Sequence, residues 1–198
     1  MQTITTKNKE QTAITSPVVW KYALQFLGWF MLFYWGTKII WGLTTPYHYY
    51  LPWLDHYFNY IILNRTIVLE SSRKILEAAG YYMYSPQPDV LTISGEYGII
   101  LNYSCLGFAV ISFWLAFVIT HHGRWWFKLI WMIIGLAIII ACNIARVCLV
   151  LLSGLEHWNL PFGLDHHTWF NIVTYIAILL LAIVYNAIVT KNTDNSII

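Results

Sequence analysis

Three short polar motifs interrupt the apolar half of the chain, and each carries a side chain able to do chemistry. They are Cys105 within Asn-Tyr-Ser-Cys-Leu-Gly, Arg146 closing Asn-Ile-Ala-Arg, and His167 within Asp-His-His-Thr. An arginine inside a segment as apolar as residues 138–152 costs roughly 2.5–3.5 kcal/mol on membrane-insertion scales. Such a residue needs a partner or a function.

A thiol, an imidazole and a guanidinium can together carry out acyl transfer. A thiolate attacks a carbonyl carbon while the imidazole moves the proton. The charge of Arg146 would favour the thiolate form of Cys105. Alternatively, its planar donor fork would hold the oxyanion or a substrate carboxylate. The sequence leaves both roles of the arginine open.

Neighbouring residues have the spacing to support such a site. Gly107, two positions after the cysteine, would let a substrate backbone approach closely. Asn143 precedes the arginine by three positions and faces the same way on a helix, and Asn171 follows His167 by one turn and can orient it. The adjacent His166 is the alternative imidazole.

The two remaining cysteines are expected to be packing residues. Cys142 lies one turn before Arg146 on a similar helix face and is the rival thiol. Cys148 points roughly 160° away from Arg146 and is expected to face lipid. No Cys-x-x-Cys pair is present, so neither a zinc site nor a bound cofactor is predicted.

Composition places the chain among membrane proteins. Of its 198 residues, 59% are hydrophobic and 10% are charged, whereas about 25% of residues are charged in an average soluble domain. No repeat or linker divides residues 1–198, which favours a single domain. The net charge of +2 comes without a basic run, which argues against nucleic acid as a partner.

The apolar segments predict an all-α polytopic membrane protein with about four transmembrane helices. These segments are residues 18–43, 106–120, 125–152 and 168–189. Residues 57–79 carry too many charges to face lipid, and their helical periodicity predicts an amphipathic helix lying at the interface. Its Glu70, Arg73 and Glu77 are expected to pair on the solvated face. Residues 90–103 alternate around a Ser-Gly-Glu turn, which predicts a short external β-hairpin with an edge open to an extended peptide.

Lysine and arginine predict the orientation, because short cytoplasmic loops are enriched in them. The tail at residues 1–17, the turn at 121–128 and the end of the chain are basic, so both termini are expected in the cytoplasm. The first span reads as a retained anchor. Arg146 lies 18 residues beyond Lys128 (146 − 128), or about 27 Å at 1.5 Å per residue. All three motifs are therefore expected at the external face.

At these motifs the chain resembles the exosortase and archaeosortase family of membrane cysteine transpeptidases. The resemblance covers residues 90–185, the expected catalytic core, with Cys105-Leu-Gly107, Asn143-Ile-Ala-Arg146 and His167 in the family's order. It identifies a short form of unassigned subfamily. It implies a protease or transpeptidase, without cofactor, that cuts C-terminal sorting signals of exported proteins. It also implies the cytoplasmic (inner) membrane of a diderm bacterium, where the lipids and the exported proteins are the partners.

Two other functions remain open at this stage. A haem or redox protein would use His121 or His122 on the inside and His166 or His167 on the outside, which places the two pairs on opposite faces. A non-catalytic membrane assembly factor would pair Arg146 with an acid such as Asp165 to fix helix packing.

Overall fold

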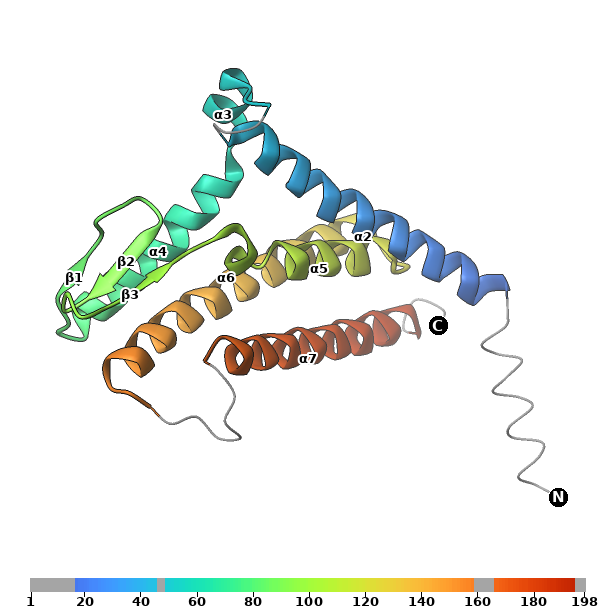
Figure 1. Cartoon of the computed structure of the whole chain (residues 1–198). Helices are drawn as coiled ribbons and strands as arrows, with labels where there is room; N and C mark the ends of the chain where they lie inside the picture. The colour runs from blue at the N-terminus through green and yellow to red at the C-terminus, as the bar shows by residue number, and fades with distance from the viewer. Residues whose placement is uncertain (1–16, 46–48, 159–165, 195–198) are drawn as a thin grey trace.

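The computed structural model describes residues 17–45, 49–158 and 166–194, and this part of the chain is mostly helical. Six α-helices are accompanied there by one short 3-10 helix and a small antiparallel sheet (Figure 1). In chain order the elements are α2 (Pro17–Thr44), α3 (Pro52–Phe58), α4 (Tyr60–Ala78), β1 (Met83–Tyr84), β2 (Val90–Ile93), β3 (Tyr97–Ile100), η1 (Tyr103–Leu106), α5 (Phe108–Thr120), α6 (Trp125–Leu155) and α7 (His166–Asp194).

All four segments predicted to cross the membrane are helical, and two of them have the length and composition to do so. Within the described residues these are α6 and the Asn171–Val189 part of α7. Helix α5 is strongly apolar but only 13 residues long. Helix α2 has 28 residues, but its many tryptophans, tyrosines and polar residues keep it from being comparably apolar. By length and composition these two helices are candidate membrane spans, and the four-span arrangement stays a prediction.

Side-chain hydrogen bonds tie three helices together at the end that carries the α5–α6 turn. His121 receives or donates one hydrogen bond with the Tyr22 hydroxyl at 3.1 Å and another with Asn186 Oδ1 at 3.0 Å, joining α2 and α7 to the end of α5. Lys128 donates to the Ile119 carbonyl at 2.8 Å, where α5 ends. The first turns of α2, the α5–α6 turn and the last turns of α7 therefore share one end of the bundle (Figure 1).

Close packing of α5 on α6 depends on a glycine facing a tryptophan. A Cβ on Gly135 would lie 1.9 Å from Trp114 Nε1, so only glycine admits the indole. The indole N–H donates to the Trp131 carbonyl at 3.1 Å. Trp114 and Tyr185 are both fully buried and meet edge to face at 6.0 Å. This aromatic contact brings α5, α6 and α7 together.

At the opposite end, α6 continues past α5 and is covered by α4 and the sheet (Figure 1). Helix α4 buries a stripe at helical spacing that consists of Ile61, Asn64, Val68, Leu69, Ser72 and Leu76. Ser72 donates to Val68 at 2.7 Å, and its own carbonyl lies 3.9 Å from Cys148 Sγ. Cys148 is thus buried against α4, and the expectation that it faces lipid is wrong. The helix predicted over 57–79 is present as α4. The helical spacing did not indicate which element the buried face of α4 packs against.

The charged face of α4 follows the predicted pairing. Arg73 contacts Glu70 at 2.7 Å and Glu77 at 3.9 Å, at i,i+3 and i,i+4 spacing, with the side chains partly exposed. The helix begins at Tyr60 because Asn59 interrupts the predicted segment and caps α4, its side chain accepting from the Ile62 N–H at 3.0 Å. Residues 52–58 form the separate helix α3.

The predicted hairpin is present as β2 and β3, and a third strand joins it. Val90 pairs with Ile100 and Ile93 with Tyr97 in antiparallel register. Ser94 and Gly95 form the turn with positive φ. The two-residue strand β1 adds to the far side of β2, giving the order β1-β2-β3. Such a short strand leaves no periodic signal in the sequence.

Candidate functional site

Cys105 lies in a tight 3-10 turn at the start of α5. The turn η1 follows β3 directly, and the Cys105 N–H donates to the Asn102 carbonyl at 2.9 Å. Gly107 ends the turn in the left-handed region with φ of +73°, and α5 begins at the next residue. The positive φ favours glycine and lets the chain change from the turn into the helix. The thiol is therefore held at a helix start, on short and ordered backbone.

Two buried asparagines fix this turn by sharing one backbone acceptor. The Leu106 carbonyl accepts from Asn143 Nδ2 on α6 at 3.1 Å and from Asn64 Nδ2 on α4 at 3.3 Å. The sequence indicated Asn143 but missed Asn64. The amide within the mostly apolar stripe of α4 was the signal for it, because a buried amide needs a partner.

Tyr103 anchors the same turn to α2. Its hydroxyl donates to Thr37 Oγ1 at 3.0 Å, and its ring lies 5.2 Å from Trp41. Phe108 stacks on the other side of Tyr103 at 5.4 Å, and Tyr60 meets Phe108 edge to face. Burial raises the pKa of Tyr60 above its ordinary value, so its hydroxyl stays neutral at physiological pH. The turn is thus held by contacts with α2, α4 and α6.

The structure brings Cys105 and Arg146 together across 41 residues of sequence. Arg146 Nη2 lies 3.9 Å from Cys105 Sγ, and both side chains are half-buried. Among the described residues, the ion pairs are those of Arg73, so no carboxylate there neutralises Arg146. A guanidinium at this distance can stabilise negative charge that develops beside the sulfur during a reaction. It also leaves donors that can bind an incoming carbonyl oxygen.

A pocket of about 200 Å³ opens beside this pair. Cys105 and Arg146 form its polar part, and the rest of its wall is apolar and comes from β3, the following loop and α6. The apolar residues are Ile99, Ile100, Leu101, Val147 and Val150. Cys142 is not among the residues that line the pocket, which separates Cys105 from the rival thiol.

Gly107 is explained by the packing of the chain itself. A Cβ at this position would lie 2.6 Å from Asn143 Nδ2. The structure thus gives Gly107 a packing role against Asn143, and its expected role in admitting a substrate backbone stays a prediction.

The histidine partner is only partly described. Helix α7 begins at His166, so both candidate histidines open the last helix as predicted. The side chains of His166 and His167 lie outside the described residues, as does Asp165, the acid considered for Arg146. Asn171 lies half-buried one turn further along α7. The meeting of an imidazole with Cys105 stays a prediction.

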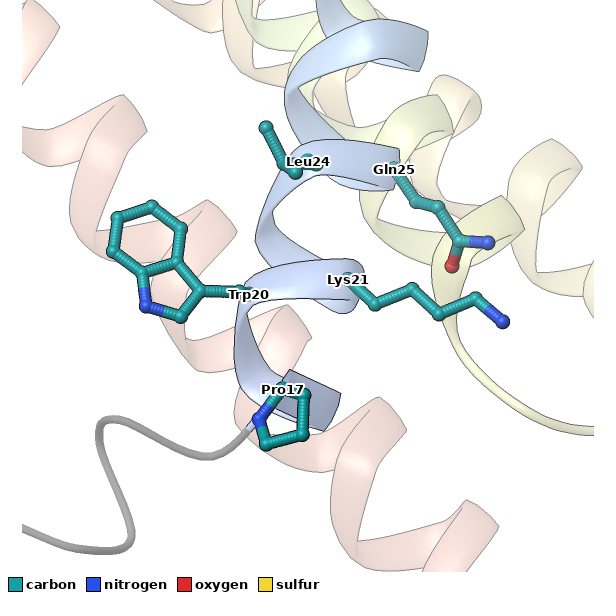
Figure 2. A pocket seen from close by; sticks show the side chains of 5 residues that line it. All are labelled: Pro17, Trp20, Lys21, Leu24 and Gln25. Atoms are coloured by element: carbon teal, nitrogen blue, oxygen red, sulfur yellow. The ribbon is translucent and has the colours of Figure 1, made fainter.

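Other parts of the described chain offer weaker sites. A larger hollow of about 790 Å³ lies along the first turns of α2. Figure 2 shows Trp20 extending to one side of this helix and Lys21 and Gln25 to the other, so the hollow is open surface. Both ring nitrogens of His121 are engaged by Tyr22 and Asn186, which disfavours His121 as a haem ligand. No group of three or more metal-binding side chains occurs in the part that the structure describes.

Comparisons with protein-family models, with curated proteins and with solved structures give no match. The chemistry of the site is accordingly inferred from its own residues. These are a thiol at a helix start, a guanidinium beside it, and an apolar pocket against both.

Proposed function

We propose that this chain is a membrane-embedded cysteine protease or transpeptidase of the exosortase type, acting on the C-terminal sorting signals of exported proteins. Cys105 is the nucleophile, Arg146 stabilises negative charge, and His167 moves the proton. The observation that carries the proposal is the 3.9 Å contact between Arg146 and the Cys105 sulfur at the wall of a pocket. No carboxylate among the described residues pairs with Arg146, which leaves its guanidinium available to a reacting group at the sulfur.

The proposed reaction has two steps. The Cys105 thiolate attacks the scissile carbonyl carbon, and the resulting oxyanion is held by Arg146. The C–N bond then breaks, the amine leaves with a proton from the His167 imidazolium, and a thioester remains on Cys105. Water or an amine next attacks the thioester, gives its proton to His167 and releases the thiolate. Water yields a protease, and an amine yields a transpeptidase.

The proposed topology has four spans, with both termini in the cytoplasm and the site at the external face of the inner membrane. Two observations support it. The end tied by His121 carries the basic turn with Arg124 and Lys128, which favours the cytoplasm. Helix α6 has 31 residues, or about 46 Å at 1.5 Å per residue, so it can cross the bilayer and still extend along α4 and the sheet.

Thiol labelling of intact cells tests the site and its orientation together. Cells producing the chain are treated with a membrane-impermeant methanethiosulfonate, and the modified cysteines are mapped by mass spectrometry. Modification of Cys105 before lysis, with Cys142 and Cys148 unmodified, is expected. Cys105 that reacts only after lysis would place the site on the wrong side of the membrane. Cys105 that is no more reactive than Cys142 in detergent would argue for a packing role.

A further inference from the structure

The outer edge of β3 has backbone groups available for pairing. β3 is the last strand in the order β1-β2-β3, and no described strand pairs with its other side. Antiparallel strands alternate between hydrogen-bonded and non-bonded pairs. Since the Leu101 N–H donates to the Asp89 carbonyl, residues 101, 99 and 97 bond towards β2. Gly98 and Ile100 therefore turn their amide groups outward.

The loop after β3 limits how far this edge extends. The Asn102 N–H donates to the Ile100 carbonyl at 3.2 Å, so that oxygen is already used. Within the described residues, the N–H and C=O of Gly98 and the N–H of Ile100 have no backbone partner, so they are available to an added chain. Donors and acceptors alternating at this spacing are complementary to an extended peptide backbone.

The edge adjoins the pocket that holds the nucleophile. Ile99 and Ile100 line the pocket together with Cys105, Val147 and Val150. Its volume of about 200 Å³ is below the 300–1,000 Å³ typical of whole-ligand sites, so it fits a single side chain. Its walls are aliphatic except at the cysteine and the arginine. A chain paired with β3 would thus place an aliphatic side chain in the pocket and a carbonyl beside the sulfur.

We propose that the substrate binds as an added strand on the edge of β3, with one aliphatic side chain in the pocket next to the scissile bond. This assignment rests on the proposed function and specifies how its substrate is recognised. Backbone pairing with Gly98 and Ile100 supplies affinity for any extended sequence, and the pocket selects the residue beside the cut.

Peptidyl chloromethyl ketones test this binding mode on the purified full-length protein in detergent. The probes are the chloromethyl ketones of acetyl-Ala-Ala-Leu, of acetyl-Ala-Ala-Asp and of acetyl-Ala-Ala-Leu methylated on its backbone nitrogens. Iodoacetamide is the reference reagent, because it carries no peptide. Alkylation of Cys105 is followed by mass spectrometry, and each rate is divided by the iodoacetamide rate. The leucine probe is expected to exceed the other two by about tenfold, because only it can both pair and fill the pocket.

Variants distinguish peptide binding at the β3 edge and pocket from the general reactivity of Cys105. Val150→Phe fills the pocket and is expected to lower the leucine ratio by about tenfold, like the loss of one well-packed side-chain contact. Ile133→Phe is the matched control, since Ile133 is an exposed residue of the same helix, and it should keep the wild-type ratio. Equal ratios for all three probes would overturn the proposal that the substrate binds on the edge of β3. The N-methylated probe needs no variant, so misfolding of Val150→Phe leaves the test intact.

The outcomes also distinguish this assignment from the proposed function. Cys105 that reacts with iodoacetamide no faster in the wild type than in Arg146→Ala contradicts the catalytic thiol, whatever the probe ratios. An activated Cys105 with equal probe ratios contradicts only the proposed substrate binding on β3, and leaves the proposed function in place. Disulfide-linked dimers of Ile100→Cys, in a chain lacking its native cysteines, would show that a second copy occupies the edge and would overturn the peptide assignment.

Discussion

Asn143 Nδ2 occupies the position that a side chain on Gly107 would need, with only 2.6 Å between that nitrogen and a Cβ built on the glycine. The same nitrogen donates to the Leu106 carbonyl at 3.1 Å. The two residues therefore pack against each other as a matched pair. The glycine leaves room for the amide, and the amide holds the turn that presents Cys105.

Gly107→Ala is expected to destabilise the protein and to displace the thiol. The positive φ alone costs an alanine about 1–3 kcal/mol, and Asn143 must also move. SDS-induced unfolding of the purified protein measures the loss. Gly28→Ala is the matched control, because a Cβ there meets nothing within 4 Å, and alanine in a helix is favoured over glycine by about 1 kcal/mol. Equal stability of Gly107→Ala and Gly28→Ala would show that the packing of Asn143 against Gly107 does not matter for stability.

The two asparagines should contribute unequally and cooperatively. Asn143→Ala is expected to cost about 1–3 kcal/mol by removing the shorter bond to a buried carbonyl. Asn64→Ala should cost less, because Asn64 Oδ1 is buried with no hydrogen-bond partner among the described residues, and removing it relieves that penalty. The double variant should lose more than the sum, because the Leu106 carbonyl then has neither amide. Strict additivity in the same unfolding measurement would indicate that the amides act independently.

Removal of the guanidinium should slow the reaction of Cys105. Arg146→Ala is expected to reduce the rate of alkylation by iodoacetamide at pH 7 by about tenfold, because the reacting sulfur loses the cation that lies 3.9 Å away. Arg73→Ala removes the same charge from an exposed pair on α4 and should leave the rate unchanged. Arg146→Lys keeps a charge without the planar fork, so its rate should lie between the two. An unchanged rate in Arg146→Ala would mean that the 3.9 Å contact has no chemical effect.

Docking of the sheet on α6 should depend on Gly154. A Cβ there would lie 2.2 Å from the Tyr97 ring, which comes from β3. Gly154→Ala is expected to loosen the sheet at a cost of about 1–3 kcal/mol, typical of overpacking, and to speed amide hydrogen exchange in β2 and β3. Gly36→Ala, where a Cβ meets nothing within 4 Å, serves as the control. Unchanged exchange in the Gly154 variant would show that the sheet is held elsewhere.

The helices and the approach of Cys105 to Arg146 could be predicted because both depend on one-dimensional quantities. Apolar length predicts α2, α5, α6 and α7, helical periodicity predicts α4, and counting residues from Lys128 predicts the level of Arg146. The short helix α3 was not predicted. The roles of Asn64 and Val150 could not be predicted, because they depend on how α4 and β3 lie against α6. The expectation for Cys148 failed for the same reason. Cys148 lies on a side of α6 that packs against α4 instead of lipid.

If Cys105 cuts exported proteins near their C-termini, as proposed, then those C-termini provide the most direct test. Mass spectrometry would compare the C-terminal peptides of exported proteins from cells with the wild-type chain and from cells with Cys105→Ala at equal abundance. We predict a set of exported proteins that is shortened in the wild type and retains full-length C-termini in the variant. Identical C-termini in both strains, with both proteins present in the membrane, would contradict the account.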